Sequence, residues 1–196
     1  KDLPFFLGLT EWLAERDIPC PKPVHGKNGK TVYDIKGKPA VLVEFLPGKN
    51  NPNITHYHMR QLGQLSAQMH LAAQDYPKKR ANDLGLREWK KLFTQVEKKC
   101  DTITPGLAKL IKDELVYLEK HWPKNLPSGV VHADLFPDNV FFKGDDLSGV
   151  IDFYFSCNEF WIYDLMITMN AWCFNGLHQF VPGRAKTLLQ SYHANR

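Results

Sequence analysis

Three polar side chains with a fixed spacing could carry out chemistry in this sequence. Asp134 lies in the segment HADLFPDN, residues 132–139, and Asp152 follows Asn139 by thirteen residues. A carboxylate at Asp134 can accept the proton of a hydroxyl group, or orient that hydroxyl for attack on phosphorus. The side-chain oxygens of Asn139 and Asp152 are the hard donors that Mg²⁺ prefers. Together the three residues predict phosphoryl transfer from a metal-bound nucleotide to a hydroxyl.

The context of this loop favours that interpretation over an ordinary turn. The spacing matches the catalytic-loop pattern H-x-D-x-x-x-x-N. Apolar residues precede the loop at 130–131 and follow it at 140–142, and the segment GVIDF, residues 149–153, delivers one carboxylate at the end of a strand. A buried strand rarely carries an unpaired carboxylate, because burying an isolated charge is costly. Motif, order and spacing therefore agree on a functional site.

Structural roles are expected for three polar residues near the loop. His132 is grouped with Asp134 in the catalytic set, although we expect it to brace the loop through hydrogen bonds rather than to titrate. Asp138 is interpreted as a turn residue and is left outside the metal set. Asp164, twelve residues after Asp152, is expected to serve either as a helix N-cap or as a buried partner of the loop.

Three histidines share one predicted helix and could be considered as metal ligands. His56, His58 and His70 lack a convergent i, i+4 pair accompanied by an acidic residue. Surface or packing positions are the better interpretation, so Asn139 and Asp152 remain the predicted metal ligands.

The local patterns predict the elements that must position these residues. Residues 3–16 repeat apolar side chains at helical spacing, and the proline-rich segment 18–24 ends this helix. Runs of β-branched and aromatic residues at 31–35 and 39–45, joined by a KGK turn, predict a hairpin. Prolines, Gly and Asn at residues 47–53 mark a boundary between lobes. Further helices are predicted at 55–74, within 86–100, at 105–122, from 163 onward and at 184–195, with two short strands and then a third within 128–155.

Composition and charge limit the class of protein. The 196 residues are 43% hydrophobic and 12% aromatic, which is typical of a folded core. The net charge of +4 comes from bases interspersed with acids, so no nucleic-acid partner is expected. The beginning of the sequence lacks signal-peptide features and no apolar run approaches the ~18 residues of a membrane span, so no membrane partner is expected. The four separated cysteines predict buried thiols in a cytoplasmic protein, whereas the oligomeric state is left open.

At these residues the sequence resembles the aminoglycoside and choline phosphotransferase family, which shares the protein-kinase-like fold. HADLFPDN is similar to the family's H-G-D-x-x-x-x-N loop, with Ala133 where Gly is usual. The segment from Ile151 to Asp164 resembles its ID…D segment, and LGQLSAQMH resembles a helix that ends in a histidine, here His70. VLVEFLPG resembles the linker between lobes.

The resemblance implies a fold class, a domain division and ligands. The fold is expected to be α+β and two-lobed, with a partial small lobe at residues 1–46 and a mostly helical large lobe at residues 47–196. ATP and Mg²⁺ are the implied cofactors, with backbone groups of Glu44 and Leu46 pairing with the adenine edge. Within the family, the likeness is greatest to members that phosphorylate the side-chain hydroxyl of L-homoserine, a step toward threonine. Candidates to line the pocket of this small-molecule substrate are Tyr154, Asn158, Asn170 and Trp172.

The chain also departs from the family. It begins at about the first helix of the small lobe, so we expect the Gly-rich phosphate loop and the strand-borne Lys to lie outside it. Lys30, Lys36 and Lys38 lie in or beside the predicted hairpin and should not replace that Lys. The position of the family's helix Glu, which pairs with that Lys, falls near Phe6. The presence of this Glu in the chain is therefore in doubt. We therefore expect a fragment with its catalytic core present and part of the ATP site missing.

Several alternatives remain beside the homoserine hypothesis. The substrate could instead be choline, ethanolamine, a methylthio-sugar or an aminoglycoside. A catalytically inactive kinase-like binding module is disfavoured by the intact set of Asp134, Asn139 and Asp152. A protein kinase is disfavoured because an aromatic run, rather than an activation loop, follows Asp152.

Overall fold

The computed structural model describes residues 2–196 and divides the chain into two compact units. The larger unit contains the residues up to Arg80 together with Pro127–Arg196, and the smaller unit is Ala81–Leu126. The predicted boundary between lobes at residues 46 and 47 is a different division of the chain, and it stays a prediction.

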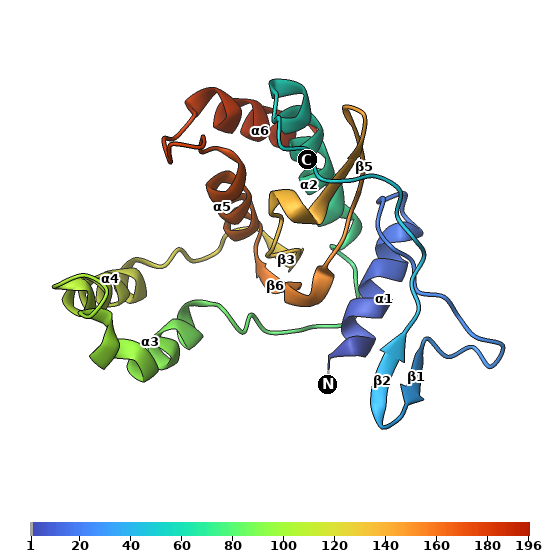
Figure 1. The fold of residues 1–196 in the computed structure, drawn as a ribbon, viewed down its shortest axis with the longest axis horizontal. Coiled ribbons are helices and arrows are strands. Elements are labelled where there is room, and N and C mark those ends of the chain that lie inside the picture. The colour runs from blue at the N-terminus through green and yellow to red at the C-terminus, as the bar shows by residue number, and fades with distance from the viewer. Residues whose placement is uncertain (1) are drawn as a thin grey trace. The chain divides into compact units, whose positions relative to one another are not determined.

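The regular structure of residues 2–196 consists of helices and short antiparallel strand pairs (Figure 1). The helices are α1 Leu3–Ala14, α2 His56–Ala72, α3 Leu86–Cys100, α4 Leu107–His121, α5 Trp161–Trp172 and α6 Pro182–Ala194. The strands are β1 Val32–Ile35, β2 Lys38–Val41, β3 Ser128–Val131, β4 Val140–Lys143, β5 Asp146–Val150 and β6 Cys157–Phe160, which pair as β1–β2, β3–β6 and β4–β5. This confirms the expected mixture of helices and strands.

The smaller unit is a helical hairpin of α3 and α4. Apolar side chains at helical spacing pack where the two helices meet, and Leu115 is buried there. The rings of Trp89 and Trp122 meet edge to face at 5.5 Å, which holds the ends of the hairpin together. Both helices agree with the predicted ranges to within two residues at each end.

Helix α1 is firmly attached to the rest of the larger unit. Pro4 occupies its first turn, where a missing N–H is tolerated, and Leu9 and Leu13 are almost completely buried. The indole N–H of Trp12 donates to the carbonyl of Ala72 at 2.7 Å, and the hydroxyl of Tyr76 donates to the carbonyl of Phe5 at 2.7 Å. These bonds fix α1 against the end of α2 and the segment that follows it.

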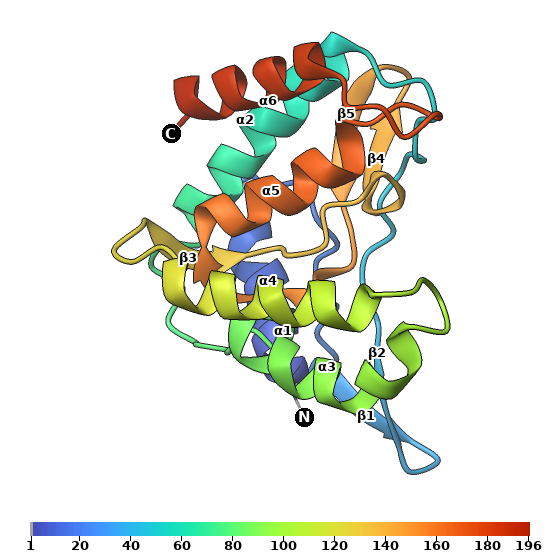
Figure 2. The ribbon, with the colours of Figure 1, turned by 90° about the vertical axis from the view of Figure 1, so that its left-hand side faces the viewer.

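Helix α2 starts at a capping box and crosses α6 at a glycine. Thr55 is the N-cap, and its side chain and backbone pair reciprocally with His58. Gly63 allows the closest approach to α6, because a methyl group there would lie only 2.4 Å from the carbonyl oxygen of Leu188. The two helices lie side by side in both ribbon views (Figure 2).

The strands of the larger unit form the frame for the loop after β3. In the β3–β6 pair Val130 lies opposite Asn158, and in the β4–β5 pair Val140 lies opposite Val150. Strand β6 was not predicted, because the sequence CNEF shows no alternation of apolar and polar residues. Helix α5 accordingly begins at Trp161, two residues before the expected start.

The core of the larger unit joins α1, α2, the strands and α6 around side chains such as Leu62, Leu135, Val140 and Leu188, each of them fully buried. All four cysteines are free thiols in buried positions, as predicted. Within residues 2–196, no helix combines the length and apolar character that crossing a bilayer requires.

Candidate active site

The predicted loop leaves β3 through a turn whose backbone is unusual. Ala133 has φ of +63°, in the left-handed region that non-glycine residues rarely adopt. The turn directs the N–H groups of His132 and Ala133 toward the protein interior, where both donate to the carboxylate of Asp164, at 3.2 and 2.7 Å. Asp134 is thereby placed at the partly exposed side of the loop.

Asp134 and Asn139 form one hydrogen-bonded unit. The amide nitrogen of Asn139 donates to the carboxylate of Asp134 at 2.9 Å and to its backbone carbonyl at 2.8 Å. Residues Pro137–Asn139 form a 3-10 turn that carries Asn139 directly into β4. Because both donor positions face Asp134, the amide oxygen of Asn139 is left to contact a cation.

Asp152 is tied to the same loop through the backbone. The N–H of Ile151 donates to the carbonyl of Asn139 at 3.0 Å, and the carbonyl of Ile151 is 3.0 Å from Nε2 of His132. Asp152 itself has φ of +62° and an exposed side chain. The structure thus brings the three predicted chemical residues to one place.

His132 braces the loop from the inside. Its Nδ1 accepts the N–H of Asp134 at 3.2 Å, so the proton of the neutral ring resides on Nε2, which donates to Ile151. Burial lowers the pKa of His132 below its ordinary value, although neighbouring carboxylates oppose this effect. The two backbone contacts fix the orientation of the His132 ring, and its expected bracing role stays a prediction.

Asp164 is the buried partner of the loop and not a helix N-cap. The N-cap of α5 is Phe160, whereas Asp164 lies in the first turn with 1% of its surface exposed. Besides the two N–H groups of the loop, it accepts a hydrogen bond from Nε2 of His70 at 2.9 Å. Burial would raise the pKa of Asp164, but the hydrogen bonds from His70 and from the N–H of Ala133 hold that pKa below its ordinary value.

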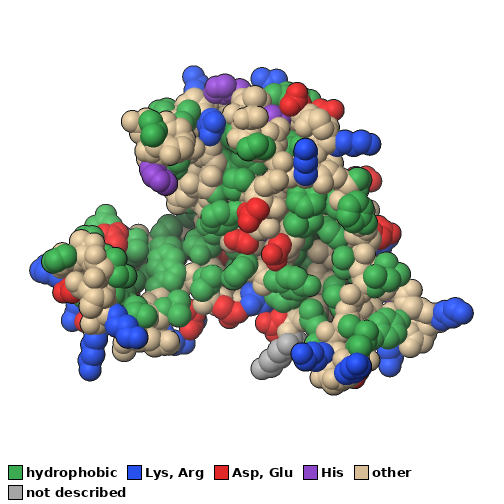
Figure 3. Space-filling model, viewed as in Figure 1, with side chains coloured by type: hydrophobic (Ala, Val, Ile, Leu, Met, Phe, Trp, Pro, Cys, Tyr) green, Lys and Arg blue, Asp and Glu red, His purple; other side chains and the backbone are tan. Residues whose placement is uncertain are grey.

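The surroundings of Asp134 raise its pKa, whereas those of Asp164 lower the pKa of that residue. Burial raises the pKa of Asp134, the hydrogen bond from Asn139 lowers it, and the negative charges of Asp152 and Asp138 raise it further. Acidic side chains gather near the middle of the face shown in Figure 3, over β3 and β6. A site of this kind favours a cation beside the carboxylates.

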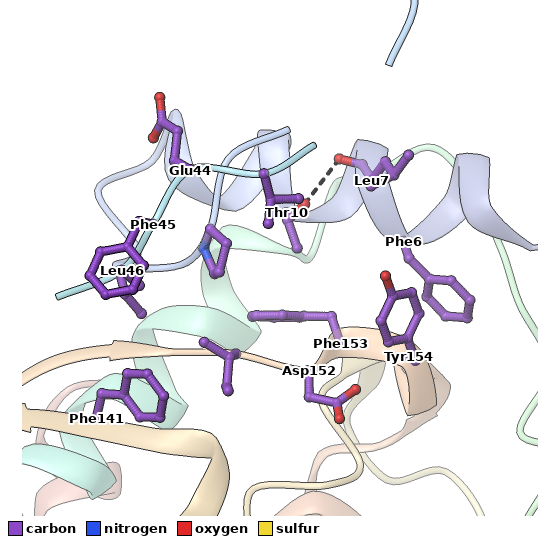
Figure 4. Close-up of a pocket in the computed structure, with 13 residues that line it drawn as sticks. Phe6, Leu7, Thr10, Glu44, Phe45, Leu46, Phe141, Asp152, Phe153 and Tyr154 are labelled. Carbon is purple, nitrogen blue, oxygen red and sulfur yellow. Dashed lines mark hydrogen bonds between the residues drawn. The ribbon is translucent and has the colours of Figure 1, made fainter. Parts of the chain in front are cut away.

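A cavity of about 410 Å³ opens next to Asp152 within the larger unit (Figure 4). It is lined by Phe6, Leu7, Thr10, Pro21, Val43, Glu44, Phe45, Leu46, Phe141, Ile151, Asp152, Phe153 and Tyr154. Its walls are mostly apolar, and Asp152 places a carboxylate at its edge. This combination can hold a flat aromatic ring with charged groups at one end.

The segment from Glu44 to Leu46 presents backbone groups at this cavity. The N–H of Glu44 donates to the carbonyl of Lys22 at 2.8 Å. Among residues 2–196, the carbonyl of Glu44 and the N–H of Leu46 have no backbone partner. The Glu44 carboxylate points away from the other labelled side chains, so hydrogen bonds from this segment to a ring would come from its backbone (Figure 4).

The four candidate substrate residues occupy different environments. Tyr154 lines the cavity and meets Phe6 edge to face at 5.4 Å. The amide oxygen of Asn158 accepts the N–H of Arg80 at 2.8 Å, and Asn170 is exposed on α5. Trp172 does not line this cavity: it is 2% exposed, and its indole N–H donates to the carbonyl of Leu135 at 2.7 Å. An indole buried in the core supports the loop instead of contacting a ligand.

The histidines of α2 have packing and surface contacts. Nδ1 of His56 is 2.8 Å from the hydroxyl of Thr187, and His58 belongs to the capping box of α2. Among residues 2–196, no group of three or more His, Cys, Asp or Glu side chains could hold a metal ion.

Sequence reasoning did not identify all the residues that support the loop. Tyr192, on α6, lies 2.8 Å from Nδ1 of His70, far from the loop in sequence. Arg80 donates to the carbonyl of Ser156 at 3.2 Å and to the carboxylate of Asp2 at 3.1 Å. The sequence signal for Tyr192 is an aromatic residue at helical spacing near the end of the chain. This signal does not distinguish an ordinary core residue from one that supports the catalytic loop.

Comparison with known proteins gives a family and a fold. The model of the phosphotransferase enzyme family matches residues 1–196. Proteins named homoserine kinase are similar throughout the chain, with 49% identity for that of Nitrobacter hamburgensis and 47% for that of Rhodospirillum rubrum. Each match covers all of this chain, and the chain spans 60% and 61% of the length of those relatives.

Solved structures share the protein-kinase-like fold of aminoglycoside phosphotransferases. An amicoumacin kinase in complex with AMP-PNP and Ca²⁺ has a TM-score of 0.73 at 19% identity, over 97% of this chain and 61% of its own. A spectinomycin phosphotransferase in complex with ADP and spectinomycin has a TM-score of 0.71 at 17% identity, over 98% of this chain and 64% of its own. At this identity the likeness concerns the fold.

Proposed function

The chain belongs to the phosphotransferase enzyme family, and from this premise we propose that the protein is an ATP-dependent kinase of L-homoserine. The phosphoryl group would be transferred to the side-chain hydroxyl, a step toward threonine. The proposed substrate rests on one observation: the whole chain has 45% to 49% sequence identity to relatives named homoserine kinase. Since the chain spans 60% to 61% of those relatives, the activity is proposed for the protein as a whole.

Asp134 is proposed as the residue that receives the substrate hydroxyl. Its carboxylate would accept the hydroxyl proton, or orient that hydroxyl, while the oxygen attacks the γ-phosphorus. The bond from Asn139 at 2.9 Å and the anchoring of the loop on Asp164 hold this carboxylate in one orientation. Positioning accounts for much of the rate enhancement in phosphoryl transfer, so a rigid loop suits the proposed role.

Asn139 and Asp152 fit a magnesium ion by the chemistry of their donor atoms. Both can offer hard oxygens, and the Asn139 amide is oriented by Asp134 so that its nitrogen is already used. When bound, Mg²⁺ would neutralise charge on the phosphate oxygens of the nucleotide. The backbone bond between Ile151 and Asn139 keeps the two ligands together.

ATP is proposed to place its adenine in the 410 Å³ cavity. The carbonyl of Glu44 and the N–H of Leu46, which have no backbone partner within residues 2–196, offer one acceptor and one donor to the edge of a purine. Asp152 lies at the rim of the same cavity, so phosphates leaving the adenine site would reach the proposed metal ligands.

Tyr154, Asn158 and Asn170 are proposed to line the homoserine side of the pocket. Tyr154 lines the cavity, and Asn158 and Asn170 are the remaining polar candidates of the larger unit. Trp172 is withdrawn from this set because its side chain is buried beneath the loop.

A coupled ADP-release assay with a panel of hydroxyl substrates tests the proposal. We expect turnover with L-homoserine and not with choline, ethanolamine or an aminoglycoside. Asp134→Asn should lower kcat by about 10²–10⁴ with little change in the KM for ATP, whereas the exposed Asp75→Asn should match the parent protein. Turnover of another panel member alone would replace the substrate, and ATP binding without any turnover would favour an inactive binding module.

A further inference from the structure

Tyr192 lies behind the catalytic loop and does not face the cavity. Its hydroxyl is 2.8 Å from Nδ1 of His70, and Nε2 of His70 is 2.9 Å from the carboxylate of Asp164. Asp164 in turn receives the N–H groups of His132 and Ala133. A continuous chain of hydrogen bonds therefore runs from α6 through α2 and α5 to the loop that carries Asp134.

For a neutral His70 ring, the hydrogen bonds allow one arrangement of protons. Asp164 accepts two backbone N–H groups and is kept ionised, so Nε2 of His70 must be the donor in the third contact. In the neutral ring Nδ1 is then an acceptor, and the hydroxyl of Tyr192 supplies the proton for that bond. Burial raises the pKa of Tyr192 to about 12, which keeps its hydroxyl protonated. Within residues 2–196, the hydroxyl has no other hydrogen-bond partner.

Packing holds this arrangement in place. His70 is fully buried, with the ring of Trp161 stacked on it at 5.5 Å and Tyr192 edge to face at 5.6 Å. Tyr192 packs against Ala67 of α2 and Leu165 of α5. The close approach of α2 and α6 at Gly63 brings Tyr192 to His70, so α6 is a fixed support (Figure 2).

We propose that Tyr192 is a positioning residue, whose hydroxyl holds His70 in the Nε2-protonated tautomer so that Asp164 keeps the catalytic loop in its working shape. Without this donor, Nδ1 of His70 becomes a buried acceptor without a partner, and the ring loses the contact that orients it. The consequence reaches Asp134 through the backbone of residues 132–134. The kinetic part of this inference rests on the proposed function, whereas the tautomer does not.

Imidazole nitrogen NMR on protein labelled with ¹⁵N-histidine tests the tautomer directly. His70→Asn identifies the His70 signals. We expect a pyridine-like Nδ1 and a pyrrole-like Nε2 in the neutral ring of His70. A neutral His70 ring that carries its proton on Nδ1 would overturn the proposal, whether or not homoserine is a substrate.

Kinetics of Tyr192→Phe test the consequence for the loop. We expect kcat to fall about 5- to 30-fold, with the KM values for ATP and homoserine changed less than twofold, because the loop and not ligand binding is affected. Tyr76→Phe is the matched control, since Tyr76 is equally buried and donates one hydrogen bond at 2.7 Å, to a backbone carbonyl of α1. Both variants should lose similar thermal stability.

The comparison of the two variants separates positioning from general stability. Equal kcat losses in Tyr192→Phe and Tyr76→Phe would overturn the proposal, as would a Tyr192→Phe variant with the kcat of the parent protein. If Tyr192→Phe does not fold, the tautomer measurement on the parent protein still decides. If the parent protein binds ATP but does not phosphorylate homoserine, the proposed substrate is wrong. The NMR measurement then tests the tautomer of His70 on its own.

Discussion

The amide nitrogen of Asn139 donates to both the carboxylate and the backbone carbonyl of Asp134, at 2.9 and 2.8 Å. One side chain therefore fixes the orientation of the proposed base, and its amide oxygen takes no part in these two bonds. The hydrogen bond also favours the ionised form of Asp134, against the effect of burial. The proton-accepting and metal-binding roles are consequently linked in this protein.

Removal of this bond should change the pH dependence of the reaction. Burial already raises the pKa of Asp134, and the Asn139 bond partly offsets that rise. The base form exists above its pKa, so the rate should fall as the pH drops through it. In Asn139→Ala the pKa rises further, and the acidic limb of kcat/KM should move to higher pH.

This prediction is checked with rate profiles at saturating Mg²⁺ between pH 5 and 8. Saturation with the metal keeps the loss of an Asn139 ligand from being mistaken for a protonation effect. An acidic limb at the same pH in both proteins would show that Asn139 does not influence the base.

Asp152 should control the dependence on Mg²⁺. Asp152→Asn is the informative change, because Asn tolerates the left-handed backbone that Asp152 adopts, at φ of +62°. Loss of one anionic ligand should raise the Mg²⁺ concentration at half-maximal rate by about 10-fold or more and lower kcat by about 10² or more. Because the side chain is exposed, the melting temperature should change little. An unchanged Mg²⁺ titration would remove Asp152 from the metal set.

The local parts of the site could be predicted from the sequence, because their signals are contiguous. Asp134 and Asn139 belong to one loop of eight residues, and Asp152 ends the next hairpin, so one motif and one spacing placed them together. The start of α2 followed from its N-cap at Thr55.

The supports of the site could not be predicted, because they depend on tertiary packing. Tyr192 and His70 are 122 residues apart in sequence and meet through the crossing of α2 and α6. The resemblance suggests Trp172 as a pocket residue, and aromatic side chains serve both pockets and cores; its burial and its bond to Leu135 are tertiary features that the sequence does not reveal. Strand β6 exists because β3 offers it a partner, which a single short segment cannot reveal.

Ala133 should be a site of stored strain. Its φ of +63° costs an L-residue about 1–2 kcal/mol, whereas glycine adopts this conformation freely. Ala133→Gly keeps the N–H bond to Asp164 and should raise the free energy of unfolding by about 1 kcal/mol. Ala108→Gly, in the right-handed helix α4, is the control and should lower stability by a similar amount. Denaturant unfolding measures both, and a destabilised Ala133→Gly would mean that the methyl group's packing outweighs the strain.

Gly63 should be the most sensitive point of the support behind the loop. A methyl group at Gly63 would come within 2.4 Å of the Leu188 carbonyl oxygen and 2.9 Å of Cβ of Ser191, both on α6. The backbone of α6 would have to move, so Gly63→Ala should destabilise the protein by about 1–3 kcal/mol. Gly176→Ala is the matched control, because a methyl group there meets nothing within 4 Å. Urea unfolding should show a lower midpoint for Gly63→Ala only, and kcat should fall with it as Tyr192 is drawn away from His70. Equal midpoints for the two variants would show that α6 adjusts without cost and is no fixed support.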